Sequence, residues 1–232
     1  MYTTLLAEQC EFYDDMLYFM RHFIKNNEKV LNSDERNLFS IACKNYMSKN
    51  QKAYRTMIAF ENKEKKKENS NYLPYVKDYR IIVENILYEK CQGNIKFIDD
   101  NIIKKDNFRN YDDEGKTFFY KMMGDYNRFI CESESFKSKC INEADKYYKE
   151  AFKISNKLPI YNPVKLGLIL NTTVFYYDTL ENKKKAIELA ESAVKKFNDE
   201  ARKLNKDEDE VKDAMDIYNL MKENLDMWKA EA

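Results

Sequence analysis

Three polar side chains able to bind an anion recur along one predicted helix, which spans about residues 33 to 62. Lys44, Gln51 and Arg55 follow one another at spacings of seven and four residues. Because an α-helix turns by about 100° per residue, they fall within one narrow stripe. The amide can donate hydrogen bonds, and the two cations can bind an oxyanion through short, charge-assisted ones. For such charges taken singly, an ordinary solvated helix face is the favoured explanation; alternatively, the stripe lines a groove.

Two further predicted helices carry mixed stripes of apolar and amide side chains. The members are Asn171, Val174 and Asp178 on one helix, and Ile217, Leu220 and Asn224 on the last helix. The spacings of three, four and seven residues place each set on one helix face. From the residues alone, core packing is the favoured explanation. Alternatively, these two stripes and the basic one line a single groove.

The groups that most enzymes require are missing. The chain has one histidine, His22, which excludes HExxH and multi-histidine metal sites. No GxxxxGK[ST], GxGxxG or GxSxG motif occurs. The cysteines are odd in number and form no CxxC pair, which indicates free thiols rather than a zinc site or disulfide framework: Cys10, Cys43, Cys91, Cys131 and Cys140. We expect no catalysis, no metal and no cofactor.

Charge and hydropathy exclude two other classes of partner. Forty basic residues balance forty acidic ones, so no net field attracts the whole chain to nucleic acid. No apolar run approaches the ~18 residues of a membrane span, and the acidic residues near the N-terminus argue against a signal peptide. We expect an intracellular, cytoplasmic protein without membrane insertion. Three consecutive lysines after Glu64 leave a nuclear location as a further possibility.

Composition and periodicity predict an all-α protein. Only 4 glycines and 3 prolines occur in 232 residues, so few turns or strand boundaries are encoded. Asn32, Asn162 and Asn182 are expected to cap helices. Nine helices are predicted, over about residues 1–12, 14–26, 33–62, 73–105, 116–132, 134–155, 163–180, 183–204 and 211–228, with a polar loop at 62–71 and a turn at 205–210.

Five segments resemble the 14-3-3 family in order and with nearly constant spacing. They are AEQCEFYDDM (7–16), DERNLFSIACKN (34–45), KMMGDYNRF (121–129), LGLILNTTVFYYD (166–178) and NLMKENLDMW (219–228). The resemblance implies nine antiparallel helices in a cup-shaped protomer with an amphipathic groove, and a dimer of such protomers. It implies one domain over 1–232, in which about 1–60 forms the dimer contact and first groove wall and about 73–232 the other walls.

The resemblance also implies roles for individual residues. Phosphate binding falls to Lys44, Gln51, Arg55, Arg128 and Phe129. The peptide groove is implied to contain Leu170, Asn171, Val174, Asp178, Ile217, Leu220, Asn224 and Trp228. The two asparagines would hold the peptide main chain, and the apolar residues would receive its side chains. The dimer interface is implied to include Leu6, Cys10, Phe12, Tyr79 and Ile86.

The chain departs from the family pattern at the phosphate site and at the dimer contact. Gln51 stands where the family has an arginine, and Phe129 where it has a tyrosine. Hydrogen bonds to a charged group contribute ~1.5–3 kcal/mol each, so two losses amount to roughly 3–6 kcal/mol unless Lys52 or Arg55 compensates. Phe12 and Ile86 replace an oppositely charged pair, for which an apolar contact can substitute.

These observations predict a non-enzymatic adaptor that binds phosphoserine- or phosphothreonine-containing segments of partner proteins. The first alternative keeps the dimeric scaffold but binds peptides weakly or without regard to phosphate, because of Gln51 and Phe129. The second, a purely structural helical scaffold, is supported by nothing beyond general helicity.

Overall fold

The computed structural model describes residues 1–201 and 209–231. Within them the chain forms nine α-helices and no strand, which confirms the predicted class and helix number. None of these helices combines the length and apolarity needed to cross a lipid bilayer. The elements are α1 Tyr2–Gln9, α2 Tyr13–Asn26, α3 Ser33–Lys65, α4 Leu73–Ile98, the π-helix η1 Asp99–Ile103, the 3-10 helix η2 Asp106–Asn110, α5 Asp113–Ile130, α6 Lys137–Ser155, α7 Pro163–Val174, the π-helix η3 Phe175–Thr179, α8 Lys183–Ala201 and α9 Asp209–Ala230.

Asparagine side chains start three of these helices, as predicted. Asn32 and Glu35 form a capping box, in which each side chain accepts a hydrogen bond from the other's backbone N–H at 2.9 Å. The side chains of Asn162 and Asn182 each accept a bond of 3.1 Å from the N–H three residues later. These bonds satisfy backbone donors that a helix start otherwise leaves unpaired.

Several helices begin or end away from their predicted limits. α1 already ends at Gln9, and the predicted helices 73–105 and 163–180 each end as a π-helix, η1 and η3. α3 continues to Lys65, where an ion pair of 2.8 Å with Glu61 spans its last turn. α5 starts at Asp113 rather than near residue 116, because Asp112 accepts a hydrogen bond of 2.6 Å from the Gly115 N–H. The predicted end of the eighth helix at Leu204 lies outside the described residues. So does most of the predicted turn at 205–210, although α9 already begins at Asp209.

A buried carboxylate explains why α6 starts at Lys137 instead of residue 134. Glu84 on α4 is 1% exposed and accepts hydrogen bonds from the hydroxyls of Ser133 and Ser135. Arg80 donates to the same carboxylate at 2.8 Å. These bonds hold the segment 133–136 in a non-helical conformation, and α6 begins directly after it.

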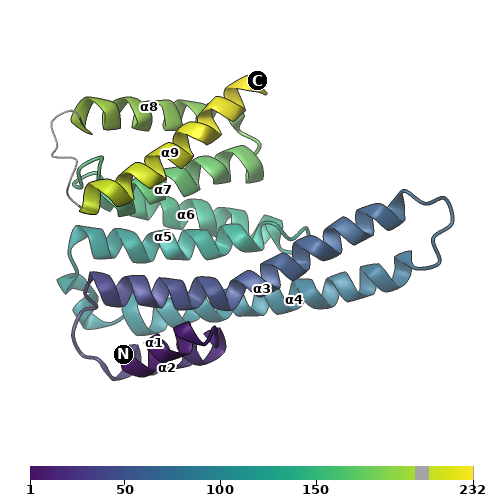
Figure 1. Ribbon diagram of the computed structural model, residues 1–232, viewed down its shortest axis with the longest axis horizontal. Coiled ribbons are helices and arrows are strands. Elements are labelled where there is room, and N and C mark those ends of the chain that lie inside the picture. The colour runs from purple at the N-terminus through teal and green to yellow at the C-terminus, as the bar shows by residue number, and fades with distance from the viewer. Residues whose placement is uncertain (202–208, 232) are drawn as a thin grey trace. The chain divides into compact units, whose positions relative to one another are not determined.

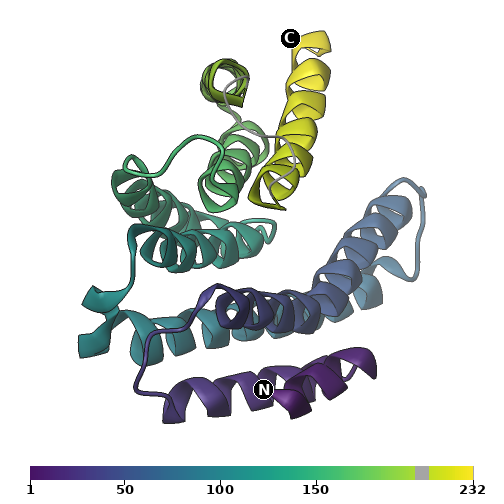
Figure 2. The ribbon, with the colours of Figure 1, turned by 60° about the vertical axis from the view of Figure 1, so that its left-hand side comes forward.

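The described chain divides into two compact units. Unit 1 comprises Met1–Asn110 and Ser133–Lys137, and unit 2 the described part of Tyr111–Glu132 and Ser138–Ala232. In unit 1, α3 and α4 pack antiparallel as a long hairpin, α2 packs on α3, and α1 packs on α2 (Figures 1 and 2). The assignment of about residues 1–60 to the dimer contact and first groove wall, and of about 73–232 to the other walls, stays a prediction. A single domain over 1–232 stays a prediction.

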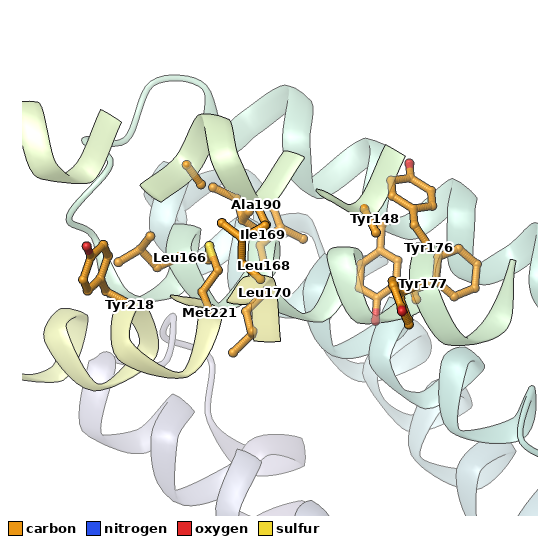
Figure 3. Packing of buried hydrophobic residues seen from close by; sticks show 14 of the residues in the cluster. Tyr148, Leu166, Leu168, Ile169, Leu170, Tyr176, Tyr177, Ala190, Tyr218 and Met221 are labelled. Atoms are coloured by element: carbon orange, nitrogen blue, oxygen red, sulfur yellow. The ribbon is translucent and has the colours of Figure 1, made fainter. Parts of the chain in front are cut away.

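Unit 2 is built around α7. This mostly apolar helix packs against α5, α8 and α9, and its residues Leu166, Leu168 and Ile169 are buried. Figure 3 shows Met221 of α9 and Ala190 of α8 meeting this part of α7. The apolar residues of α7 thus form the centre of the hydrophobic core of unit 2. Asn171 of the same helix is only partly buried.

Candidate functional site

Arg128 lies near the C-terminal end of α5 and is held on two sides within unit 2. Its Nε donates a hydrogen bond of 3.3 Å to the Tyr148 hydroxyl of α6. The centre of its guanidinium lies 4.7 Å from the centroid of the Phe129 ring, within the range of a cation–π contact. Burial lowers the pKa of Arg128, but its interactions with Tyr148 and Asp125 outweigh burial and raise it. Arg128 is therefore a fixed and permanent cation.

Tyr148 reaches this position because the neighbouring helix has no side chain at residue 124. A Cβ atom built on Gly124 would lie 2.6 Å from the Tyr148 ring. The ring is fully buried, and burial raises its pKa far above the ordinary tyrosine value, so the hydroxyl stays protonated. Sequence reasoning did not identify Tyr148. The available signal was Gly124, one of only 4 glycines, inside the KMMGDYNRF segment.

Asp125 connects Arg128 to the next helix. Its Oδ1 accepts hydrogen bonds from the Tyr148 hydroxyl at 2.7 Å and from Asn171 Nδ2 at 2.8 Å. Its Oδ2 forms an ion pair of 2.9 Å with Lys121. Arg128 lies three residues after Asp125 on α5, and the hydrogen-bonded link between them passes through the Tyr148 hydroxyl. Asn171 and Arg128 are thereby tied to one buried network.

The other two residues of the predicted α7 stripe, Val174 and Asp178, lie after Asn171 along the same side of α7 and η3. Val174 is partly exposed at the end of α7, and Asp178 is exposed on η3. Leu170 is mostly buried and belongs to the hydrophobic core of unit 2. Partial desolvation raises the pKa of Asp178, although the charge of Arg128 acts in the opposite direction. The stripe therefore presents an amide, an apolar group and a carboxylate along one edge.

On α9 the predicted stripe is accessible, whereas Trp228, which the resemblance alone places in the groove, is buried. Ile217 and Asn224 are partly exposed, and Leu220 is 48% exposed. Trp228 is only 3% exposed, because its indole stacks on the Tyr177 ring at 4.5 Å between centroids. Its described contacts are those of a core residue that supports α9, rather than of a groove wall.

The basic stripe lies in unit 1, along one face of α3. Lys44 and Arg55 are exposed, and Gln51 is half-buried between them. The exposed side chain of Lys52 adjoins the same stripe. Within unit 1 these positions lie along one side of α3. Their convergence with Arg128 on a single ligand stays a prediction.

Comparison with known proteins identifies the family. A family model described as 14-3-3 protein matches residues 3–229. The chain belongs to the 14-3-3 family. It is 33% identical to 14-3-3 protein 10 of Solanum lycopersicum, over all of this chain and 92% of that protein. Identity is 36% to 14-3-3 protein eta of Homo sapiens (97% of this chain, 91% of that protein) and 35% to a 14-3-3 protein of Giardia intestinalis (98% and 90%).

Membership of the 14-3-3 family confirms the prediction of a non-enzymatic adaptor, because these proteins act by binding partner proteins. The family also forms dimers, in agreement with the general prediction. In the described part of this 14-3-3 protein, no three His, Cys, Asp or Glu side chains gather into a group suited to a metal ion.

The residues predicted for the dimer contact all lie on the surface of unit 1. Leu6 and Cys10 are exposed on and just after α1, and Phe12, 63% exposed, precedes α2. Tyr79 and Ile86 are exposed on α4, seven residues apart and so on one face. This 14-3-3 protein thus presents apolar side chains on both α1–α2 and α4, which is the chemistry that an interface between protomers requires.

Proposed function

We propose that this 14-3-3 protein binds extended segments of partner proteins that carry phosphoserine or phosphothreonine, and that it does so as a homodimer in the cytoplasm. The observation that carries the proposal is the network around Asp125. It fixes a permanent cation, Arg128, and an amide, Asn171, in one unit.

Each fixed group suits one part of such a ligand. A phosphate monoester carries about −1.5 to −2 charge at pH 7 and forms strong bonds with guanidinium donors. Because Nε of Arg128 is engaged with Tyr148, its terminal nitrogens remain for the phosphate. Asn171 donates a hydrogen bond from Nδ2 to Asp125, which leaves its Oδ1 to accept a peptide N–H. Lys44 and Arg55 are proposed to add cationic contacts.

The other groove residues are proposed to hold the chain on either side of the phosphate. Asn224 supplies a second amide for the peptide main chain. The exposed surfaces of Val174, Ile217 and Leu220 receive apolar side chains, and Leu170 backs this wall from the core. Asp178 places a carboxylate at the end of the α7 stripe and favours partners with a cation there.

Gln51 and Phe129 support a second candidate, in which the same scaffold binds peptides weakly or independently of phosphate. Gln51 offers an amide without charge, and Phe129 offers no hydroxyl. Phe129 still stacks on Arg128 and so contributes to its orientation. The two candidates therefore differ in affinity and phosphate dependence, not in the location of the site.

A binding assay separates the candidates. Peptides with degenerate flanks around a central phosphoserine, and their unphosphorylated twins, are titrated by fluorescence anisotropy. We expect the phosphorylated set to bind at least about tenfold more tightly, and Arg128→Gln to abolish most of that difference. Lys153→Gln, which alters an exposed cation of the same unit, serves as the control. Equal affinity of the two peptide sets for the wild type would refute phosphate reading and favour the second candidate.

The dimer is tested separately by light scattering. We expect the mass of two protomers at micromolar concentration, and a shift towards one protomer for Ile86→Asp. Ile81→Asp, on another face of α4 and similarly exposed, should leave the mass unchanged. A wild-type mass near one protomer would contradict the proposed interface.

A further inference from the structure

Unit 2 contains a cavity whose lining residues are distinct from those proposed for the phosphopeptide. Its volume is about 490 Å³, within the range of roughly 300–1,000 Å³ that is usual for small-molecule sites. The end of α6, the connection to α7, α7 itself and the second half of α8 form its walls. Residues from these four segments include Phe152, Leu158, Ile160, Lys165, Ile169 and Leu189.

Most of this surface is apolar and well supported. Ile160 and Ile169 are almost fully buried and belong to the core of unit 2, and Phe152 and Leu189 pack against that core. In Figure 3, Ile169 lies beside Ala190, so α7 and α8 meet at Ile169, which also lines the cavity. An apolar group placed here would be removed from water and would gain about 25 cal/mol per Å² of its buried surface.

Lys165 is the half-buried cation of this cavity. Its Nζ donates a hydrogen bond of 2.6 Å to the Leu158 carbonyl oxygen, a neutral acceptor. Burial lowers the pKa of Lys165; Glu200 on α8 opposes this shift and Lys196 adds to it. Both of these α8 side chains also line the cavity.

Unlike Lys165, lysines on the adjacent surface of α6 form ion pairs with carboxylates. Three of them form ion pairs with acidic residues one turn away: Lys146 with Glu143, Lys149 with Asp145, and Lys153 with Glu150. In the described part of the chain no carboxylate lies within ion-pair distance of Lys165. The cavity therefore combines apolar walls with a partly desolvated ammonium whose direct hydrogen bond, among the described residues, goes to a neutral carbonyl.

We propose that this cavity binds a small amphipathic carboxylic acid, with its carboxylate on Lys165 and its aliphatic body against Ile160 and Ile169. The carboxylate supplies a counter-charge in direct contact with Lys165, which no described residue provides, and Lys196 at the same rim can bind its second oxygen. One negative charge balances the two lysines and Glu200. This ligand site is independent of the proposed phosphopeptide site.

Octanoate is a suitable probe for the first test. It is titrated into the wild-type protein by nuclear magnetic resonance, beside octan-1-ol and octylamine, which have the same chain but carry no charge or a positive one. We expect saturable octanoate binding, octan-1-ol binding at least about tenfold weaker, and no binding of octylamine. Absence of saturable octanoate binding, or equal affinity for octan-1-ol, would overturn the proposal. These comparisons require no variant and so do not depend on a variant folding.

Variants then locate the site. Lys165→Met should weaken octanoate binding by at least about tenfold, and Lys165→Arg should retain most of it. Lys157→Met, which alters an exposed lysine of the same connection, should have no effect. Ser192→Phe, at the exposed rim on α8, should block the cavity. Phosphopeptide affinity should be unchanged in all four. Undiminished octanoate binding by folded Lys165→Met would contradict the assignment.

Discussion

The ring of Tyr148 packs directly on the backbone of Gly124. A Cβ atom at residue 124 would lie 2.6 Å from Cδ1 and 2.7 Å from Cε1 of this ring, which is closer than real Cβ contacts allow. The overlap involves the body of a fully buried ring rather than the end of a flexible chain. This contact sets the separation of α5 and α6 at the point where Arg128 meets Tyr148.

Gly124→Ala should destabilise the protein despite the better helix propensity of alanine. Alanine gains up to about 1 kcal/mol in a helix interior, but overpacking a core costs typically 1–3 kcal/mol. We expect a lower free energy of unfolding in urea. Gly93→Ala is the matched control, because a Cβ at Gly93 meets nothing within 4 Å, and it should stabilise the protein slightly. Stabilisation by both substitutions would show that the ring moves away at little cost.

Tyr148→Phe should weaken both the fold and the proposed phosphate site. The hydroxyl donates to Asp125 and accepts from Arg128, so its loss removes one hydrogen-bond partner from each of two charged groups. Leaving a buried polar group unsatisfied costs about 1–3 kcal/mol. Urea unfolding should show this loss, and phosphopeptide affinity should fall while unphosphorylated binding changes little. The control is Tyr161→Phe, a partly buried tyrosine of the same unit. An equal effect on both peptides would limit Tyr148 to a structural role.

Local signals were sufficient to predict the helices and most of their starts. Asn32, Asn162 and Asn182 act on backbone groups three residues away, so their effect is readable from neighbouring sequence alone. The start of α6 was not readable in this way. It depends on Glu84, about fifty residues earlier, which binds Ser133 and Ser135.

The candidate site shows the same division. Helical spacing placed Asn171 and Val174 on one face of α7, and the family resemblance indicated Arg128. Tyr148 carries no local signal, because its role depends on a tertiary contact with Gly124 and Asp125 across the α5–α6 packing. Trp228 was expected in the groove, but its face of α9 packs on Tyr177. Helical spacing alone does not tell a groove wall from the core that supports it.

Glu84→Gln should make the free energy of unfolding change less with pH in the acidic range. Burial raises the pKa of Glu84, but hydrogen bonds from Ser133 and Ser135 and the charge of Arg80 outweigh it, and the pKa is lowered. A lowered native pKa means that the carboxylate stabilises the fold above its unfolded pKa, about 4.3, and that this contribution is lost as pH falls through the native pKa.

Urea unfolding at several pH values measures this effect. Breaking a buried ion pair costs about 3–5 kcal/mol, so the Gln variant should be less stable at neutral pH, and the difference should shrink below about pH 4. Glu89→Gln, an exposed position on the same helix, is the control. A constant difference across the acidic range would mean that the charge of Glu84 is not what stabilises this segment.

Gln51→Arg and Phe129→Tyr should each raise phosphopeptide affinity. The first adds a cation to the α3 stripe, and the second adds a hydroxyl to a ring that already stacks on Arg128. One hydrogen bond to a charged group contributes ~1.5–3 kcal/mol, or about 10- to 150-fold in affinity. Calorimetric titration with one phosphopeptide would show whether the double variant approaches the product of the two gains.

The unphosphorylated peptide supplies the control, because neither substitution should improve its binding. A gain restricted to the phosphorylated peptide would mean that the native pocket reads phosphate with reduced strength. Tight native binding with no gain from either substitution would mean that Lys52 or Arg55 already provides the missing donors. Equal gains for both peptides would instead point to a general increase in surface charge, since a bond to the phosphate itself cannot form with the unphosphorylated twin.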